Sequence, residues 1–193
     1  MSELLKELRI SITAVLCLAL LLCGLYPALV WTAAQILFPH QANGSLITVD
    51  GKVVGSELVG QDFKAAKYFH PRPSAAGDGY DPAGSGGSNL GPISRSLLDS
   101  VKNRVDLYRS ENNLPAGTPV PVEAVTASAS GLDPHISLAD ADRQAPRVAG
   151  ARGVGVDAVK RMVETHTEGR DLGIFGQERV NVLRLNSALD GRP

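Results

Sequence analysis

Four polar side chains that could together perform hydrolysis lie within eight residues of one another. They are Ser128, Ser130, Asp133 and His135, the residue types of a nucleophile, a base and the acid that orients the base. A catalytic triad is assembled from distant segments, whereas polar residues this close in sequence more often hydrogen bond the loop that carries them. We therefore expect no active site of its own in this chain, and a membrane-anchored extracellular hydrolase is the weakest of our hypotheses.

Two glycine motifs imitate nucleotide-binding loops but lack what the chemistry requires. Residues 79–85 have the spacing of a phosphate-binding loop without its lysine, and the glycines from Gly153 onward do not follow a strand. The four histidines show no metal-ligand spacing, and both cysteines, Cys17 and Cys23, lie in an apolar segment. The sequence thus predicts no catalytic residue and no metal site, and it identifies no cofactor-binding residue.

Charge and hydropathy exclude further classes of protein. The 193 residues contain 19 Lys and Arg against 20 Asp and Glu, so the chain lacks the basic surplus of a nucleic-acid-binding protein. No Asp, Glu, Lys or Arg occurs from Ile10 to Val49, although charged residues are spread through the rest. This distribution excludes a multi-span membrane protein and an ordinary cytosolic domain.

Residues 10–30 are predicted to form one transmembrane helix. Roughly 20 apolar residues at a rise of about 1.5 Å cross the hydrocarbon core of about 30 Å, and Trp31 follows at the interface. The alternative is a signal peptide cleaved before Gln35, but the apolar run exceeds a signal core of about 7–15 residues. Small residues four apart, Gly24 and Ala28, would let a partner helix approach closely, and Pro27 would bend or end the helix.

The positive charges beside this helix predict its orientation. Lys6 and Arg9 precede the apolar run, and no Lys or Arg follows until Lys52. The positive-inside rule then places residues 1–9 in the cytoplasm and the bulk of the chain outside, with residues 31–44 as a linker. We therefore expect a single-pass protein of the cell membrane (inner or plasma membrane) with an extracytoplasmic C-terminal domain.

Residues 45–193 are predicted to fold as a soluble α+β (mixed α/β) domain. Asp50-Gly51 between two β-branched runs indicates a hairpin. Apolar spacing and capping signals predict helices, and β-branched runs predict strands. Three helices are expected. The first has Leu97, Leu98, Val101, Val105 and Tyr108 on one face, the second runs from Ser137 towards Pro146, and the last covers about Val156–Thr165 with Val156, Val159, Met162 and Val163 inward. The expected strands are Val120–Thr126 and Arg179–Leu185.

Two polar segments, residues 68–92 and 126–137, have the composition of flexible loops. Their glycines permit positive φ, and their Asn, Ser and Asp side chains satisfy exposed backbone groups. We expect the first segment to follow a fixed path that a β-branched residue at Gly86 or Gly87 would strain if φ is positive there. Its carboxylates, Asp78 and Asp81, form turns under this hypothesis; the alternative is that they and Asp133 concentrate cations.

The same segments resemble the C subunit of the Kdp potassium-transporting ATPase. The resemblance extends from the N-terminal anchor to residues 186–190, and its motifs occur in the family's order. We take the following motif residues as candidate structural or interaction residues: Arg72, Pro73, Ser74, Ser85, Gly86, Gly87, Ser88, Asn89, Ser128, Ser130, Gly131, Leu132, Asp133 and Arg147.

This resemblance implies an accessory subunit of a high-affinity, ATP-driven potassium importer. Its partners would be a channel-like potassium-binding subunit, a P-type ATPase subunit and a small single-span subunit, and potassium would be the transported ion. The family is described as a catalytic chaperone that raises the ATPase subunit's affinity for ATP. Since an outward-facing domain cannot reach cytosolic ATP, this influence would pass through the assembled complex. The alternative hypothesis is a reversed topology, with a cytoplasmic domain that binds ATP directly.

Overall fold

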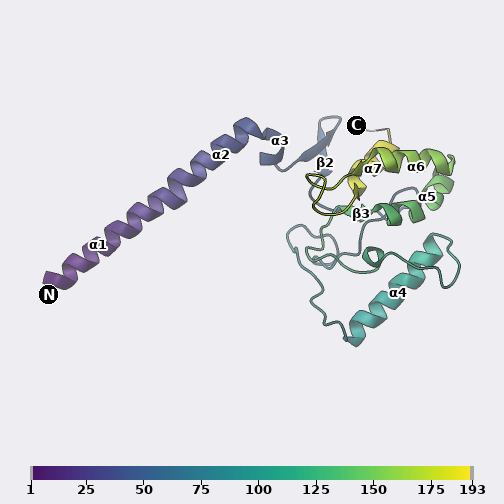
Figure 1. Cartoon of the computed structure of the whole chain (residues 1–193), viewed down its shortest axis with the longest axis horizontal. Coiled ribbons are helices and arrows are strands. Elements are labelled where there is room, and N and C mark those ends of the chain that lie inside the picture. The colour runs from purple at the N-terminus through teal and green to yellow at the C-terminus, as the bar shows by residue number, and fades with distance from the viewer. Residues whose placement is uncertain (1, 192–193) are drawn as a thin grey trace. The chain divides into compact units, whose positions relative to one another are not determined.

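The computed structural model describes residues 2–191, which divide between residues 46 and 47 into two compact units (Figure 1). The first unit is helical. The second combines helices with two small antiparallel sheets and long irregular segments, which agrees with the predicted α+β class.

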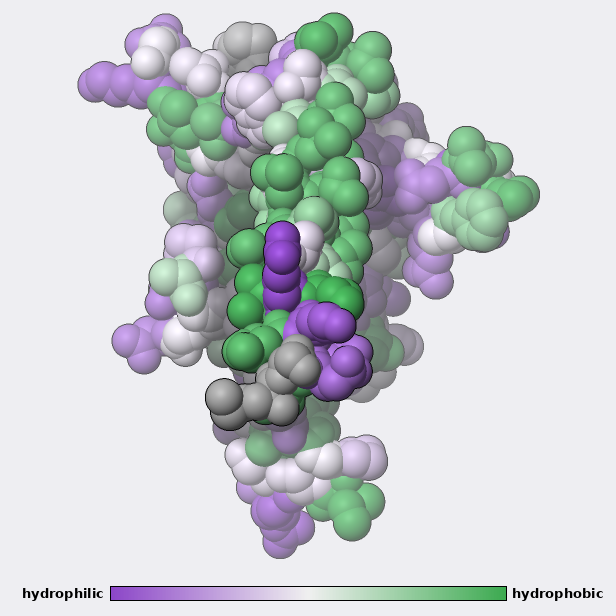
Figure 2. Space-filling view, turned by 90° about the vertical axis from the view of Figure 1, so that its left-hand side faces the viewer, coloured by the Kyte–Doolittle hydropathy of each residue, from purple (hydrophilic) through white to green (hydrophobic). Residues whose placement is uncertain are grey.

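The first unit is dominated by one long apolar helix. It consists of α1 (Ser2–Ala19), a π-helical segment (Leu20–Leu25) and α2 (Tyr26–Leu37), and a short α3 (Pro39–Ala42) follows. Glu3–Leu37 forms 35 helical residues, a length of about 50 Å, against about 30 Å for a hydrocarbon core. Figure 2 shows apolar side chains over the viewed side of this helix. By length and composition this helix can cross a membrane, and it continues beyond both ends of the predicted span.

The helix does not end at Pro27. The turn before this proline is widened into the π-helical segment, and the backbone N–H of Tyr26 donates to the carbonyl of Leu21, five residues earlier. Proline has no N–H to donate, and a π turn locally changes the hydrogen-bond pattern of a helix without breaking it. The chain therefore continues as a helix to Leu37.

The predicted hairpin begins at Leu46, the last residue of the first unit, and otherwise belongs to the second. Strand β1 (Leu46–Val49) pairs with β2 (Lys52–Ser56) across a two-residue turn. Asp50 has a φ of 49° and Gly51 a φ of 75°, and a type I′ turn requires positive φ at both positions. The Asp-Gly signal thus predicted this element correctly.

A three-stranded antiparallel sheet and three helices enclose the core of this unit. The sheet has the order β3 (His135–Ser137), β5 (Arg179–Asn181), β4 (Thr167–Glu168), and Ile136 pairs with Val180. Helices α5 (Leu138–Arg152), α6 (Val156–Thr165) and α7 (Val182–Leu189) pack with it, α5 chiefly against α6. The buried apolar cluster consists of Phe69, Ile136, Ala141, Ala145, Val148, Ala149, Val159, Val163, Val180, Val182 and Leu185.

Three predicted elements have different bounds or types in the structure. Val120–Thr126 is not a strand but carries a single 3₁₀ turn, Val122–Ala124, because Pro121 removes an N–H donor inside the segment and Pro119 removes another just before it. Arg179–Leu185 is a strand only to Asn181, whose side chain accepts the N–H of Arg184 and caps α7. The helix that begins at Ser137 passes Pro146 and ends at Arg152, held by buried residues on both sides of the proline.

Helix α4 (Arg95–Glu111) confirms the helix predicted there, but less of its predicted inner face is buried than expected. Among the residues of its predicted inner face, only Tyr108 is buried, and Leu98 is 54% exposed. Val156, at the exposed start of α6, was also wrongly predicted to face inward, whereas Val159 and Val163 are buried. Between β2 and α4 the chain contains no helix or strand within the described residues 57–94.

Candidate functional site

The segment Ala66–His70 is held by side chains instead of by a β-ladder. All five of its carbonyl oxygens accept hydrogen bonds from side chains of α5 and α7. Arg147 donates to the carbonyls of Ala66 and Tyr68 at 2.7 and 2.9 Å, and Arg152 donates to that of Lys67 at 2.7 Å. We call Ala66–His70 the clamped segment.

Two buried amide side chains complete the clamp in a reciprocal manner. Asn186 accepts the N–H of Phe69 at 2.8 Å and donates to the carbonyl of the same residue at 3.0 Å. Gln144 does the same for His70, at 2.7 and 3.0 Å. Each amide therefore replaces the partner strand for one residue, which places the ring of Phe69 in the core with no exposed surface.

The positions of the clamping residues on α5 follow helical geometry. Asp140, Gln144 and Arg147 are spaced four and three residues apart, so they share the face that α5 turns towards the clamped segment. Gln144 also bonds both of these neighbours, and Arg147 reaches Asn112 at the end of α4 at 3.0 Å. A polar stripe on the buried face of this helix thus connects α4, α5 and the clamped segment.

The two polar segments dock on each other at Gly131. The carbonyl of Ser130 accepts the N–H of Gly86 at 2.9 Å and the Ser85 hydroxyl at 3.0 Å. Gly131 has a φ of 69°, and a Cβ atom there would lie 2.7 Å from the N atom of Ala76 and 2.8 Å from the carbonyl oxygen of Gly86. Gly131 is therefore the position at which glycine is required for this contact.

The expected strain at Gly86 and Gly87 is not present, because neither has a positive φ. A Cβ atom on Gly86 would meet nothing closer than 3.9 Å, whereas one on Gly87 would lie 3.1 Å from the carbonyl oxygen of Ala129. In the same loop Asn89 has a φ of 50°. Close approach therefore constrains Gly87, and backbone conformation constrains Asn89.

Arg72 and Ser74 fix the path of the first polar segment. Ser74 Oγ accepts the N–H groups of Ala76 and Tyr80, at 3.1 and 2.8 Å, and the Tyr80 hydroxyl donates back to the carbonyl of Arg72. The Arg72 guanidinium forms an ion pair with Asp133 at 2.7 Å, which ties this segment to the second one. Asp81 accepts the N–H of Ala83, as a turn-forming residue does.

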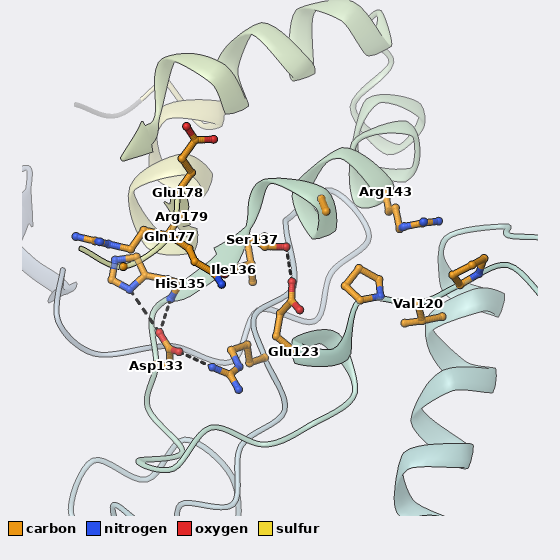
Figure 3. Close-up of a pocket in the computed structure, with 15 residues that line it drawn as sticks. Val120, Glu123, Asp133, His135, Ile136, Ser137, Arg143, Gln177, Glu178 and Arg179 are labelled. Atoms are coloured by element: carbon orange, nitrogen blue, oxygen red, sulfur yellow. Dashed lines mark hydrogen bonds and ion pairs between the residues drawn. The ribbon is translucent and has the colours of Figure 1, made fainter. Parts of the chain in front are cut away.

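A groove of about 700 Å³ opens beside this ion pair (Figure 3). In Figure 3, Asp133, His135 and Arg179 lie together at one side of it, and Glu123 and Arg143 lie towards the other. The charges alternate: His135 lies 3.4 Å from Asp133 and 3.7 Å from Glu168, which pairs with Arg179 at 3.1 Å. We call the groove with its charged lining residues Arg72, Glu123, Asp133, His135, Arg143, Glu178 and Arg179 the charged groove.

Asp133 is ionised in this groove. Its burial opposes ionisation, but hydrogen bonds from the His135 side chain and N–H and from Arg72 outweigh that effect and hold its pKa at about 2. Because its charge is paired with Arg72, Asp133 fits a structural role, in which it connects the two polar segments, better than a role in attracting cations from solution.

Of the four polar residues that suggested hydrolysis, Ser130 and Asp133 bond their own loop, and Asp133 and His135 also pair with Arg72 and Glu168, respectively. The Ser130 hydroxyl accepts the N–H of Leu132, and Asp133 accepts the N–H of His135 at 3.0 Å. Ser128 is buried, and Ser137, the serine that lines the groove, donates to Glu123 and caps α5. In the described residues His135 pairs with carboxylates, and no serine hydroxyl is bonded to it.

Comparisons with known proteins identify the family of this chain. The family described as "K+-transporting ATPase, c chain" matches residues 8–191. The chain is 55% identical over 185 residues to the potassium-transporting ATPase KdpC subunit of Mycobacterium tuberculosis, covering 96% of this chain and 98% of that protein. It is 56% identical over 188 residues to the KdpC subunit of Nitratidesulfovibrio vulgaris, covering 97% and 95%. The chain belongs to the KdpC family.

The structure places most of the family motif residues in the contacts described above. Arg72, Ser85, Gly86, Ser130, Gly131 and Asp133 join the two polar segments, Ser74 holds the first segment, and Arg147 belongs to the clamp. Leu132 contributes through its carbonyl, which accepts the N–H of Gly60 at 2.8 Å. Sequence reasoning missed Gln144, Asn186 and Arg152 as site residues. A signal existed for Gln144, because Asp140, Gln144 and Arg147 have the spacing of one helix face.

Gly131→Ala is expected to destabilise the second unit by about 1–3 kcal/mol, because the new methyl group would combine a positive φ with contacts under 3 Å. Two variants serve as controls: Gly86→Ala adds a methyl in open space, and Gly117→Ala tests a φ of 84° without a close contact. Urea unfolding of the full chain in detergent measures the three. A Gly131→Ala cost no larger than that of Gly117→Ala would show that the close approach is unimportant.

The buried carboxyl of Asp140 predicts a pH dependence of stability. Burial raises its pKa to about 6 from an ordinary 3.8, against opposing hydrogen bonds from Tyr108 at 2.5 Å and Gln144 at 3.1 Å. Between about pH 4 and 6 the folded chain keeps a proton that the unfolded chain has lost, so the free energy of unfolding should fall as pH rises through this window.

Asp140→Asn should remove that fall, which is on the order of 2 kcal/mol, whereas Asp142→Asn, on the exposed face of the same helix, should keep it. Unfolding of the three proteins at pH 4, 5, 6 and 7 gives the comparison. Parallel pH profiles for wild type and Asp140→Asn would contradict the assignment to Asp140.

Proposed function

We propose that this chain is the single-span accessory subunit of an ATP-driven potassium import complex. The observation that carries the proposal is family membership over residues 8–191 together with one N-terminal helix long enough to cross a membrane. Its partners would be the channel-like potassium-binding subunit, the P-type ATPase subunit and the small single-span subunit. In this role the second unit stabilises the assembly through shape, since its motif residues mostly hold loops in place.

The charges at the helix start support an extracytoplasmic second unit. Lys6 and Arg9 lie within α1, whereas the rest of the helix and α3 carry no Lys or Arg. With this orientation cytosolic ATP lies across the membrane from the charged groove. Assistance to the ATPase subunit would then be an allosteric coupling through the assembled complex, in which the contacts of this chain favour the nucleotide-binding conformation.

Protease accessibility tests the topology. Protease added to intact spheroplasts should digest the second unit and leave a protected fragment that contains residues 2–37, because only the helix and its cytoplasmic start are shielded. A cytosolic marker protein serves as the control for intact cells. Protection of the whole chain until lysis would contradict the orientation and support direct ATP binding by a cytoplasmic domain.

Packing of the helix gives a second test of complex membership. Gly24→Leu with Ala28→Leu should reduce recovery of the chain with its partner subunits, because bulky residues prevent close approach of a partner helix. Leu18→Ala with Leu22→Ala, four residues apart on the same helix, is a control that adds no bulk. Affinity purification from mild detergent measures recovery, and membrane insertion is checked separately. Unchanged recovery of the Leu variant would show that the second unit alone holds the complex.

A further inference from the structure

The loop between β4 and β5 presents three large apolar side chains to solvent. Leu172 is 89% exposed, Ile174 69% and Phe175 60%. They lie within four consecutive residues, flanked by glycines at Gly169 and Gly176. We call Leu172–Phe175 the apolar tip. Contiguous exposed apolar residues of this size mark an interaction site more often than isolated ones do.

The backbone holds the apolar tip in one conformation. Asp171 and Phe175 form a reciprocal bridge in which each N–H donates to the other's carbonyl at 2.9 Å. Leu172, with a φ of 54°, and Gly173, with a φ of 77°, make the turn inside this bridge. A non-glycine residue held at positive φ is uncommon, so the turn presents the Leu172 side chain at a conformational cost.

Ion pairs attach the apolar tip to the sheet. The carboxylate of Asp171 pairs with the Arg179 guanidinium at 3.2 Å, and Arg179 also pairs with Glu168 on β4 at 3.1 Å. The base of the tip is thereby fixed to both strands from which the loop emerges. Because it is preorganised, the apolar tip loses little conformational entropy when it binds a pocket of matching shape.

We propose that the apolar tip inserts into a hydrophobic pocket on another protein subunit of the potassium import complex. This inference rests on the proposed function and adds to it the surface that makes the contact. Three apolar side chains on a rigid turn have the form of an interface anchor, in which a few buried residues supply most of the binding energy. The polar residues around them would form the rim of the interface.

The charges around the tip favour a protein partner over a lipid surface. Arg170, Arg179 and Arg184 are balanced by Glu168, Asp171 and Glu178. Attachment to an anionic bilayer is normally supported by a basic surplus, which this balanced set does not supply. A rigid backbone also matches a preformed pocket better than fluid lipid, which adapts to any apolar shape.

The apolar tip is continuous with the charged groove. Gly176, Gln177, Glu178 and Arg179 follow the tip directly and line the groove of about 700 Å³, as the last three do in Figure 3. A partner that receives the tip would therefore also face Asp133 and His135. The apolar tip and the charged groove form one surface, in which the tip is the apolar anchor and the groove is the polar region that can select the correct partner.

Site-directed crosslinking in the intact complex tests this contact. Phe175→Cys is introduced with Cys17→Ser and Cys23→Ser, labelled with benzophenone maleimide and illuminated in membranes that contain the whole complex. We expect a crosslink to an identified subunit of the complex from position 175. The matched control is Ile93→Cys in the same background, since Ile93 is 92% exposed but lies outside the tip.

Removal of the apolar surface gives an independent measurement. Leu172→Ser with Phe175→Ser should lower the fraction of the chain retained with its partner subunits after detergent washing by about tenfold, the loss expected for anchor residues. Ile93→Ser should leave retention unchanged. Because all three side chains are exposed, unfolding midpoints of the variants should match that of the wild type, which separates loss of contact from loss of fold.

The results that would overturn the inference are distinct. Labelling of lipid alone from position 175 would assign the tip to the bilayer, and full retention of the Leu172→Ser/Phe175→Ser variant would show that the tip bears no contact. If the wild-type chain itself does not purify with transport subunits, the proposed function fails first and the inference fails with it. Crosslinking to a subunit together with reduced retention would establish it.

Discussion

The second unit depends on the way five consecutive carbonyl groups are satisfied without a partner strand. The clamped segment, Ala66–His70, lies along α5 and α7 and passes from exposed residues at Ala66 and Lys67 to the buried Phe69, where an unpaired backbone group would cost about 1–3 kcal/mol. Arg147, Arg152, Gln144 and Asn186 supply the missing partners. With this satisfied backbone the ring of Phe69 can be fully buried, and the segment joins helices far apart in sequence.

Order at the clamped segment propagates to the polar loops beside it. Two residues further on, Arg72 pairs with Asp133, and Ser85, Gly86 and Gly131 bring the two loops into contact. The polar residues that composition alone would assign to flexible loops are therefore held in place, and Arg72, Asp133 and His135 from these loops line the charged groove. This arrangement suits the proposed role of a subunit that contributes shape to a complex, and the chain belongs to the KdpC family over residues 8–191.

Local sequence signals predicted some elements well and failed where tertiary contacts determine whether a segment is a helix or a strand. Asp50-Gly51 specified its hairpin, and the spacing of Val159 and Val163 located α6, because both signals act within a few residues. The strand predicted over Arg179–Leu185 becomes a helix at Val182, since Asn181 caps it and Leu185 enters the core. The family motif singled out Arg147 but not its role, because its acceptors lie 79 and 81 residues away and no local pattern reveals them.

Amide hydrogen exchange at Phe69 and His70 tests the clamp most directly. These two N–H groups belong to no helix or strand, yet they bond the side chains of Asn186 and Gln144 at 2.8 and 2.7 Å. In the folded full chain both should exchange as slowly as amides in the middle of α5, and Asn186→Ala should accelerate Phe69 far more than amides of α4. Exchange of Phe69 and His70 in the wild type at the rate of the exposed residues near Gly79 would contradict the account.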